Sequence, residues 1–183
     1  VARLMREAGI QGLYRRRRRG CTVRDLHAEP YLDLVDQDFV VEDPDEIWCT
    51  DITEHPTREG KVYCAAVIDV FSRRVVGWSI DDNMRTELVT DALGMAITRR
   101  NPDRQATILH SDHGSQFTSW AFGRRLVDAG LVPSMGSIGD CYDNSLVESF
   151  WGTMQLELLD SRIWATRAEL ATAIFEWIEC WYN

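Results

Sequence analysis

Three acidic side chains occupy unusual places in the hydrophobic pattern of this sequence. Asp51 interrupts an apolar, strand-like run at residues 47–53, Asp112 directly follows a similar run at 107–111, and Glu148 lies in the first turns of a helical pattern. A carboxylate buried in a strand is costly unless it is paired, protonated or bound to a cation. Each residue taken singly is more often a turn, cap or solvated residue, so only their combination indicates a site.

Carboxylates brought together from two strands and a helix start have the chemistry of a divalent-cation site. Mg²⁺ prefers oxygen ligands and usually takes few carboxylates, together with water and phosphate oxygens. Two such ions about 3.5–4 Å apart can activate a nucleophile and stabilise the leaving oxygen in phosphoryl transfer. This chemistry needs no cysteine, serine or lysine nucleophile, which suits a sequence whose only lysine is Lys61.

The spacing of apolar residues predicts the elements that must position these side chains. Strands are expected at residues 47–53, 62–70, 75–80, 107–111 and 131–135, with a turn at Glu59-Gly60. Helices are expected from Thr86 as N-cap to Asn101, over 122–129 with Gly130 closing it, through 147–158, and over 167–181. Short connections make the first three strands antiparallel, and Pro133 places the fifth at a sheet edge. The expected fold class is therefore α/β, with a mixed five-stranded sheet flanked by helices.

Composition favours a folded domain over a disordered or membrane-embedded chain. The 183 residues suit one compact domain with a short appendage, and 45% of them are hydrophobic. We see no run long enough for a membrane span and no secretory signal at the N-terminus. The five cysteines are scattered without a C-x-x-C pair, which is typical of reduced thiols in a cytosolic protein.

Charge is distributed unevenly along the chain. The net charge is −9, but residues 1–20 hold seven arginines and one glutamate, so this arm carries +6 and the remainder −15. Seven acidic residues and no basic residue lie at 33–46, within a polar stretch over about 21–45 that we interpret as a linker. The basic arm is suited to phosphate contact, whereas acidic clusters repel nucleic acid unless they hold cations.

Three motifs around the carboxylates resemble bacterial insertion-sequence transposases of the OrfB type, which have a retroviral-integrase-like core. The motifs are Trp48-Cys49-Thr50-Asp51-Ile52-Thr53, then His110-Ser111-Asp112 with Gly114-Ser115-Gln116-Phe117-Thr118-Ser119, and Gly139-Asp140-Cys141-Tyr142-Asp143-Asn144 leading to Glu148-Ser149-Phe150. The second aspartate and the glutamate are separated by 35 residues, the spacing of that family. The resemblance covers about residues 46–183, and residues 1–20 resemble the end of the family's helix-turn-helix region.

This resemblance implies an RNase H-like fold and metal-dependent DNA strand transfer, in which water attacks first and a DNA 3′-hydroxyl attacks in the joining step. Asp51, Asp112 and Glu148 would form the catalytic, metal-binding triad, with Mg²⁺ or Mn²⁺ as cofactor, as two ions. Residues 46–183 would be a catalytic core that stops short of the family's basic C-terminal segment. The implied partners are DNA, as element ends and target, and further copies of the chain, in the bacterial cytoplasm at the nucleoid.

Several residues are candidates for DNA contact. They are Arg15, Arg16, Arg17, Arg18, Arg19, Gln116, Tyr142, Asn144 and Gln155. The arginine run is alternatively a solvated linker, and Asn144 is alternatively a helix N-cap. Gln155 stands seven positions after the glutamate, where a basic residue is common in the family, and His113 stands where many members have arginine. Both departures reduce the local positive charge.

Other conspicuous residues have structural explanations of equal or greater weight. Four tryptophans at helical spacing have apolar neighbours, which favours core packing or a dimer surface over base stacking; they are Trp151, Trp164, Trp177 and Trp181. His110 either orients Asp112 or a metal-bound water, or it is a hydrogen-bonded structural residue at a strand end.

Three functions are compatible with the sequence. The first is an active transposase core. The second is another RNase H-like nuclease, which would hydrolyse nucleic acid without joining strands. The third is a non-catalytic remnant of a transposase that only binds DNA or partner chains.

Overall fold

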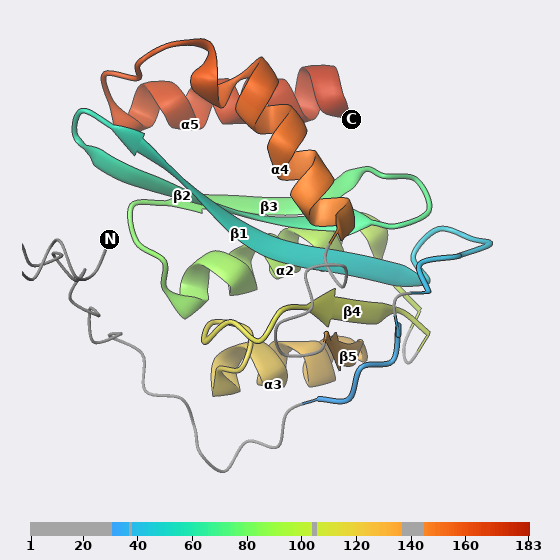
Figure 1. Cartoon of the computed structure of the whole chain (residues 1–183). Coiled ribbons are helices and arrows are strands. Elements are labelled where there is room, and N and C mark those ends of the chain that lie inside the picture. The colour runs from blue at the N-terminus through green and yellow to red at the C-terminus, as the bar shows by residue number, and fades with distance from the viewer. Residues whose placement is uncertain (1–30, 37, 104–105, 137–144) are drawn as a thin grey trace, which may run out of the picture.

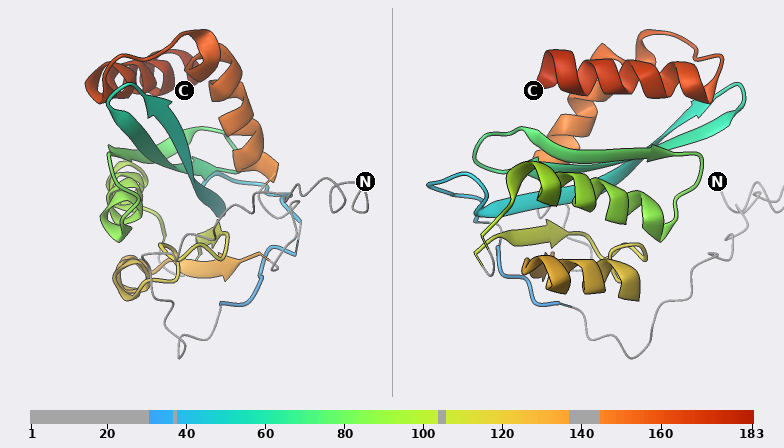
Figure 2. Two further views of the ribbon diagram at one scale, coloured as in Figure 1. Left: turned by 60° about the vertical axis from the view of Figure 1, so that its left-hand side comes forward. Right: turned by 180° about the vertical axis from the view of Figure 1, so that it is seen from behind.

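A five-stranded sheet lies between two layers of helices in the computed structural model, which describes residues 31–36, 38–103, 106–136 and 145–183 (Figures 1 and 2). The strands are β1 (Ile47–Thr57), β2 (Gly60–Asp69), β3 (Val75–Asp81), β4 (Ile108–Ser111) and β5 (Val132–Met135). The helices are α2 (Thr86–Arg100), α3 (Trp120–Ala129), α4 (Ser145–Glu157) and α5 (Arg167–Glu176), with a 3₁₀ turn η2 (Leu159–Ser161) and a π-helix η3 (Trp177–Tyr182). Within these ranges no helix has the length and apolar character needed to cross a membrane.

The sheet is mixed, with the strand order β3-β2-β1-β4-β5. β1, β2 and β3 form an antiparallel meander, while β4 and β5 run parallel to β1 and return through helices. The predicted mixed five-stranded α/β fold is therefore confirmed. Pro133 lies in β5 at the sheet edge, as predicted, where its missing N–H leaves no ladder bond unmade.

Each face of the sheet carries its own hydrophobic core. Helices α4 and α5 cover one face of the sheet, and α2 and α3 cover the other (Figure 2). Successive β1 residues alternate between the two cores, so Cys49 packs in the core under α4 and α5, and Trp48 in the core against α2 and α3. The neighbouring strand β2 is buried on both faces, with Ala66 in one core and Ala65 in the other. The two cores fix β1 between β2 and β4, which is the position from which Asp51 projects.

Helix α2 packs unusually close to β3. A Cβ on Gly77 would lie only 2.2 Å from the carbonyl oxygen of Ala92, so glycine is required for this contact. The predicted N-cap of α2, Thr86, is wrong by one residue, because Thr86 is already helical and the extended residue before it is Arg85, whose side chain makes no capping bond. The predicted end is confirmed, with Asn101 in the left-handed conformation at φ 46°.

The last helix changes its hydrogen-bonding pattern. We predicted one helix over residues 167–181, whereas α5 ends at Glu176 and continues as the π-helix η3. The wider turn brings Trp177 and Tyr182, five residues apart, into stacking at a ring-centroid distance of 5.1 Å. Stacking of these two rings favours the π turn, and the apolar pattern of the sequence gives no sign of it.

Part of the acidic segment packs on the domain although it holds no helix or strand. Val35 is buried in the core under α4, and the backbone N–H of Leu34 donates to Ser134 Oγ of β5 at 2.9 Å. These contacts tie residues 31–36 to the parallel side of the sheet. Acidic side chains in this segment therefore lie next to the folded core.

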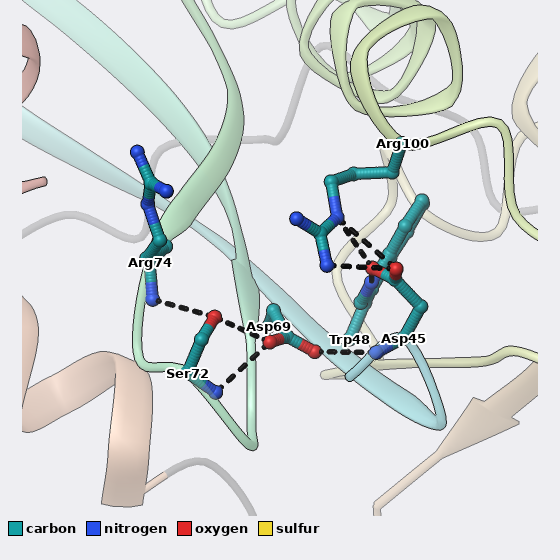
Figure 3. Close-up of polar contacts among 6 residues, drawn as sticks. All are labelled: Asp45, Trp48, Asp69, Ser72, Arg74 and Arg100. Atoms are coloured by element: carbon teal, nitrogen blue, oxygen red, sulfur yellow. Dashed lines mark hydrogen bonds and ion pairs between the residues drawn. The ribbon is translucent and has the colours of Figure 1, made fainter. Parts of the chain in front are cut away.

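Two other aspartates stabilise the fold around the start of β1 by accepting hydrogen bonds (Figure 3). Asp45 accepts a two-nitrogen contact from Arg100 of α2, with distances from 2.8 to 3.1 Å, and the indole N–H of Trp48 at 2.9 Å. Asp69 is completely buried and accepts the backbone N–H groups of Asp45 and Ser72, each at 2.9 Å. These bonds join the β2–β3 turn, the start of β1 and the end of α2, so both carboxylates serve the fold.

Candidate active site

Two of the predicted carboxylates lie side by side because their strands are parallel neighbours. Thr50 of β1 is paired with Ser111 of β4. Asp51 and Asp112 directly follow these two residues, so they are neighbours across the two strands. Neighbouring strands are about 4.8 Å apart, which places the two backbones within reach of one shared ligand. The register of the β1–β4 pair therefore assembles the first half of the site.

A tight turn after β4 fixes the carboxylate of Asp112. Its Oδ1 accepts the backbone N–H of Gly114 at 2.9 Å, and a Cβ on Gly114 would lie 2.8 Å from that same oxygen. A side chain at position 114 would therefore have to displace the Asp112 carboxylate. Asp112 itself is exposed, so its remaining lone pairs face solvent.

The third carboxylate comes from the first turn of α4. Leu146 and Val147 anchor the start of this helix in the core, and Glu148 is exposed. One turn further on, the indole N–H of Trp151 donates to Asp51 Oδ2 at 3.1 Å. Since residues three apart share a helix face, the face that carries Glu148 is the one turned toward β1.

The charges of the three side chains act on one another. Burial raises the pKa of Asp51 from 3.8 to about 6. This net value includes smaller contributions: hydrogen bonds from the Ile52 backbone and the Trp151 indole lower the pKa, and the negative charges of Asp112 and Glu148 raise it. A partly buried carboxylate beside two further negative charges is stabilised by a bound cation.

The carboxylate oxygens of this arrangement are the donors that a hard divalent ion prefers, and the arrangement does not enclose the ion. Among the described residues, no three acidic, histidine or cysteine side chains are gathered closely enough to enclose a metal by themselves. Mg²⁺ is usually held by one or two carboxylates together with water and substrate phosphates, so an open array is compatible with this ion. Asp51 and Asp112 are the pair best placed to share such an ion.

The structure describes two of the other predicted DNA contacts, Gln116 and Gln155, and both are bonded within the fold. Gln116 is buried, and its amide nitrogen donates to the carbonyl of Met84 at 3.2 Å, which links the β4–α3 loop to the start of α2. Gln155 donates to Asp160 of η2 and so ties the end of α4 to the following turn. The remaining candidates lie outside the described residues; they are Arg15, Arg16, Arg17, Arg18, Arg19, Tyr142 and Asn144.

The two histidines near Asp112 differ in their surroundings. His110 is buried, with Nδ1 at 3.0 Å from Ser134 Oγ of β5, a contact that favours its structural interpretation. His113 is partly exposed, and its buried Nδ1 makes no hydrogen bond within the described part of the chain.

The sequence interpretation missed the contact of Trp151 with Asp51. In the sequence, the apolar neighbours of Trp151 favour core packing or a dimer surface. The available signal was its position three residues after Glu148, which places both on one helical face. Trp164 and Trp177 are buried, as expected of core residues, whereas Trp181 is exposed.

Models of known protein families match most of this chain. An integrase core domain model matches residues 41–141, and a second integrase core domain model matches residues 129–183.

Curated relatives are transposases. The transposase for insertion sequence element IS629 of Shigella sonnei is 41% identical over 183 residues, which is all of this chain and 60% of the relative. The transposase for IS904 of Lactococcus lactis is 40% identical over 151 residues, or 82% of this chain and 59% of the relative. The putative transposase for IS986/IS6110 of Mycobacterium tuberculosis is 36% identical over 188 residues, covering 100% of this chain and 67% of the relative. The chain thus spans roughly 60% of the length of the first two relatives.

Two solved structures that match this fold are retroviral. The chain matches a chain of the simian T-cell lymphotropic virus intasome in complex with PP2A regulatory subunit B56 gamma with a TM-score of 0.63 at 16% identity, over 87% of this chain and 56% of that one. It matches the HTLV-2 integrase catalytic core domain in complex with magnesium, in its trimeric form, with a TM-score of 0.54 at 20% identity, over 73% and 84%. The predicted RNase H-like fold is confirmed by these matches. Together with the family models and the relatives, they show that the chain belongs to the integrase core domain family, in the branch represented by the transposases of bacterial insertion sequences.

Proposed function

We propose that this chain is the catalytic core of a DNA transposase, which cuts element ends and joins their 3′-hydroxyls to target DNA by metal-dependent phosphoryl transfer. The observation that carries the proposal is the β1–β4 register, which sets Asp51 and Asp112 next to each other, with Glu148 close enough to act on the Asp51 charge. The relatives are named as transposases, which supports the reaction class.

In this function Asp51, Asp112 and Glu148 hold two Mg²⁺ or Mn²⁺ ions. When bound, such ions polarise the scissile phosphate and make water or a hydroxyl a stronger nucleophile. Burial of Asp51 lowers the local dielectric and so strengthens its attraction for a cation. Asp112 and Glu148 are exposed, which leaves their oxygens accessible to ions that arrive with DNA phosphates. The HTLV-2 integrase core, which has the same fold, was solved with magnesium, and this supports the choice of metal.

Nucleic-acid contacts outside the carboxylates belong to the same proposal. The basic run Arg15–Arg19 would contact phosphates, and Tyr142 and Asn144 would lie at the DNA end that enters the site. Gln116 and Gln155 would contribute through the loops that they brace. The chain would act as a homo-oligomer on DNA at the bacterial nucleoid, in line with the intasome and the trimeric core among the matched structures.

The test is a transesterification assay on a branched DNA duplex in which a 3′-hydroxyl already lies beside the target phosphodiester. Such a substrate needs no sequence-specific end binding, because the reacting groups are held together in one molecule. The full chain would be incubated with Mn²⁺ and the labelled branch, beside Asp112→Asn and Glu148→Gln. Glu87→Gln, an exposed acidic residue of α2, is the matched control.

We expect Mn²⁺-dependent resealing of the branch by the wild type and Glu87→Gln, and at least a 100-fold loss in the two site variants. Cleavage without resealing would assign the chain to RNase H-like nucleases. Metal binding without any turnover would identify a non-catalytic core, and equal activity in Asp112→Asn would remove this carboxylate from the site.

A further inference from the structure

The indole of Trp151 contacts a carboxylate of the candidate site directly. It comes from α4, is half-buried, and donates its N–H to Asp51 Oδ2 of β1 across a separation of 100 residues. An indole nitrogen is a donor only, so it favours the carboxylate form and fixes which oxygen points toward α4. The carboxylate of Asp51 also accepts a hydrogen bond from the Ile52 backbone.

The same helix delivers both Trp151 and Glu148 to the site. Because the two residues are three apart on one face, rotation or sliding of α4 that broke the indole bond would also move Glu148. The bond therefore fixes the position of the helix-borne carboxylate relative to the strand-borne one. No other side-chain hydrogen bond between α4 and β1 is found among the described residues.

The indole is held in place by packing. Phe150 lies 4.7 Å from the Trp151 ring, and Phe150 in turn contacts Trp177 at 5.8 Å and Tyr182 at 4.9 Å, all between ring centroids. These tilted and edge-to-face contacts form a continuous aromatic cluster from η3 to the carboxylate. Trp177 also donates its indole N–H to a carboxylate, Glu157 at 3.1 Å, but this pair lies at the other end of α4.

We propose that Trp151 is a positioning residue of the carboxylate site, whose indole N–H orients Asp51 and keeps Glu148 aligned with it for divalent-cation binding. The proposal rests on the proposed function for its consequence in catalysis. Groups that orient a metal ligand from behind typically change metal affinity or activity by about 10–100-fold when removed. Trp151 touches neither the metal nor DNA in this role.

The test uses the full chain and pairs two substitutions of the same kind. Trp151→Phe removes the N–H and retains an aromatic ring beside Phe150, and Trp177→Phe does the same to the indole–carboxylate pair with Glu157. Hydrogen exchange of both indole protons would be measured by NMR in the metal-free wild type and in Asp51→Ala. Mn²⁺ binding would be measured by electron paramagnetic resonance for the wild type and both phenylalanine variants.

We expect slow exchange of the Trp151 indole proton, accelerated about tenfold or more in Asp51→Ala, with the Trp177 proton unchanged. Mn²⁺ affinity should fall by about 10–100-fold in Trp151→Phe and by less than twofold in Trp177→Phe. Exchange that is indifferent to Asp51→Ala, or equal Mn²⁺ affinity in Trp151→Phe and the wild type, would overturn the positioning role alone. Asp51-dependent exchange in a wild type that binds no Mn²⁺, even with a short DNA duplex present to supply phosphates, would overturn the proposed function, and the positioning role with it, while the hydrogen bond would stand.

Discussion

Asp51→Asn should stabilise the metal-free protein at neutral pH. The carboxylate is held with a pKa raised from 3.8 to about 6, chiefly by burial, so its ionised form is less favourable in the folded than in the unfolded chain. A difference of about two pH units corresponds to about 3 kcal/mol at 1.36 kcal/mol per unit. Asp51 retains some solvent access, which reduces this ceiling to roughly 1–3 kcal/mol.

The gain in stability of Asp51→Asn over the wild type must depend on pH in a defined direction. The folded protein binds the Asp51 proton more tightly than the unfolded chain, so this group destabilises the fold progressively as pH rises from about 4 through 6. Below pH 3.8 the carboxyl is protonated in both states and the cost vanishes. The advantage of Asp51→Asn should therefore be full above pH 6 and close to zero near pH 4.

The assay is urea unfolding in EDTA at pH 7.5 and pH 4.0, with thermal unfolding as a second measure. For a chain of this size 2 kcal/mol corresponds to a Tm rise of roughly 4–8 °C. Asparagine keeps an oxygen that can accept the Trp151 indole N–H, so the substitution changes charge with little change in packing. Asp91→Asn, an exposed aspartate of α2, is the control and should stay within about 0.5 kcal/mol. An Asp51→Asn protein no more stable than the wild type at pH 7.5 would refute the argument.

Three further substitutions test the packing that supports the site. Gly77→Ala forces a Cβ to 2.2 Å from the Ala92 carbonyl oxygen and should cost about 1–3 kcal/mol or prevent folding; wild-type stability in urea would show that α2 can move away. Trp164→Ala empties a site that is 2% exposed and should cost about 3–5 kcal/mol, whereas a loss under 1 kcal/mol would mean that the core refills. Arg100→Met leaves the partly buried Asp45 without its two-nitrogen partner and should lower the free energy of unfolding by roughly 1–3 kcal/mol. A double-mutant cycle with Asp45→Asn checks this, and additive effects would mean that the pair is not coupled.

Much of the fold could be predicted because its local signals agree with one another. Short apolar runs marked the strands, Gly130 and Asn101 marked helix ends, and Pro133 marked the sheet edge. The π-helix η3 could not be predicted, since an apolar helical pattern does not distinguish the i+5 bond that lets Trp177 and Tyr182 stack. The N-cap of α2 was misplaced because Thr86 has the right chemistry one position late.

The candidate site was predictable in its residue types and less so in its surroundings. Asp51 and Asp112 stood out as polar residues in or after apolar runs, and the parallel register that aligns them follows from the fold. The Trp151 bond joins residues 100 apart, and the apolar neighbours of Trp151 concealed its polar use. Gln116 likewise faces the interior, because the β4–α3 loop folds back toward the start of α2.

The central claim is that Asp51, Asp112 and Glu148 together form a divalent-cation site, and thermal unfolding with Mn²⁺ tests it most directly. A ligand that binds only the native state stabilises it by roughly 2.7 kcal/mol at about 100 times its Kd, which is a Tm rise of roughly 5–11 °C here. We predict that the wild type shows this rise, with or without a short DNA duplex to supply phosphates, and that Asp112→Asn loses it. An equal Mn²⁺-dependent rise in Asp112→Asn, or none in the wild type even with DNA present, would contradict the claim.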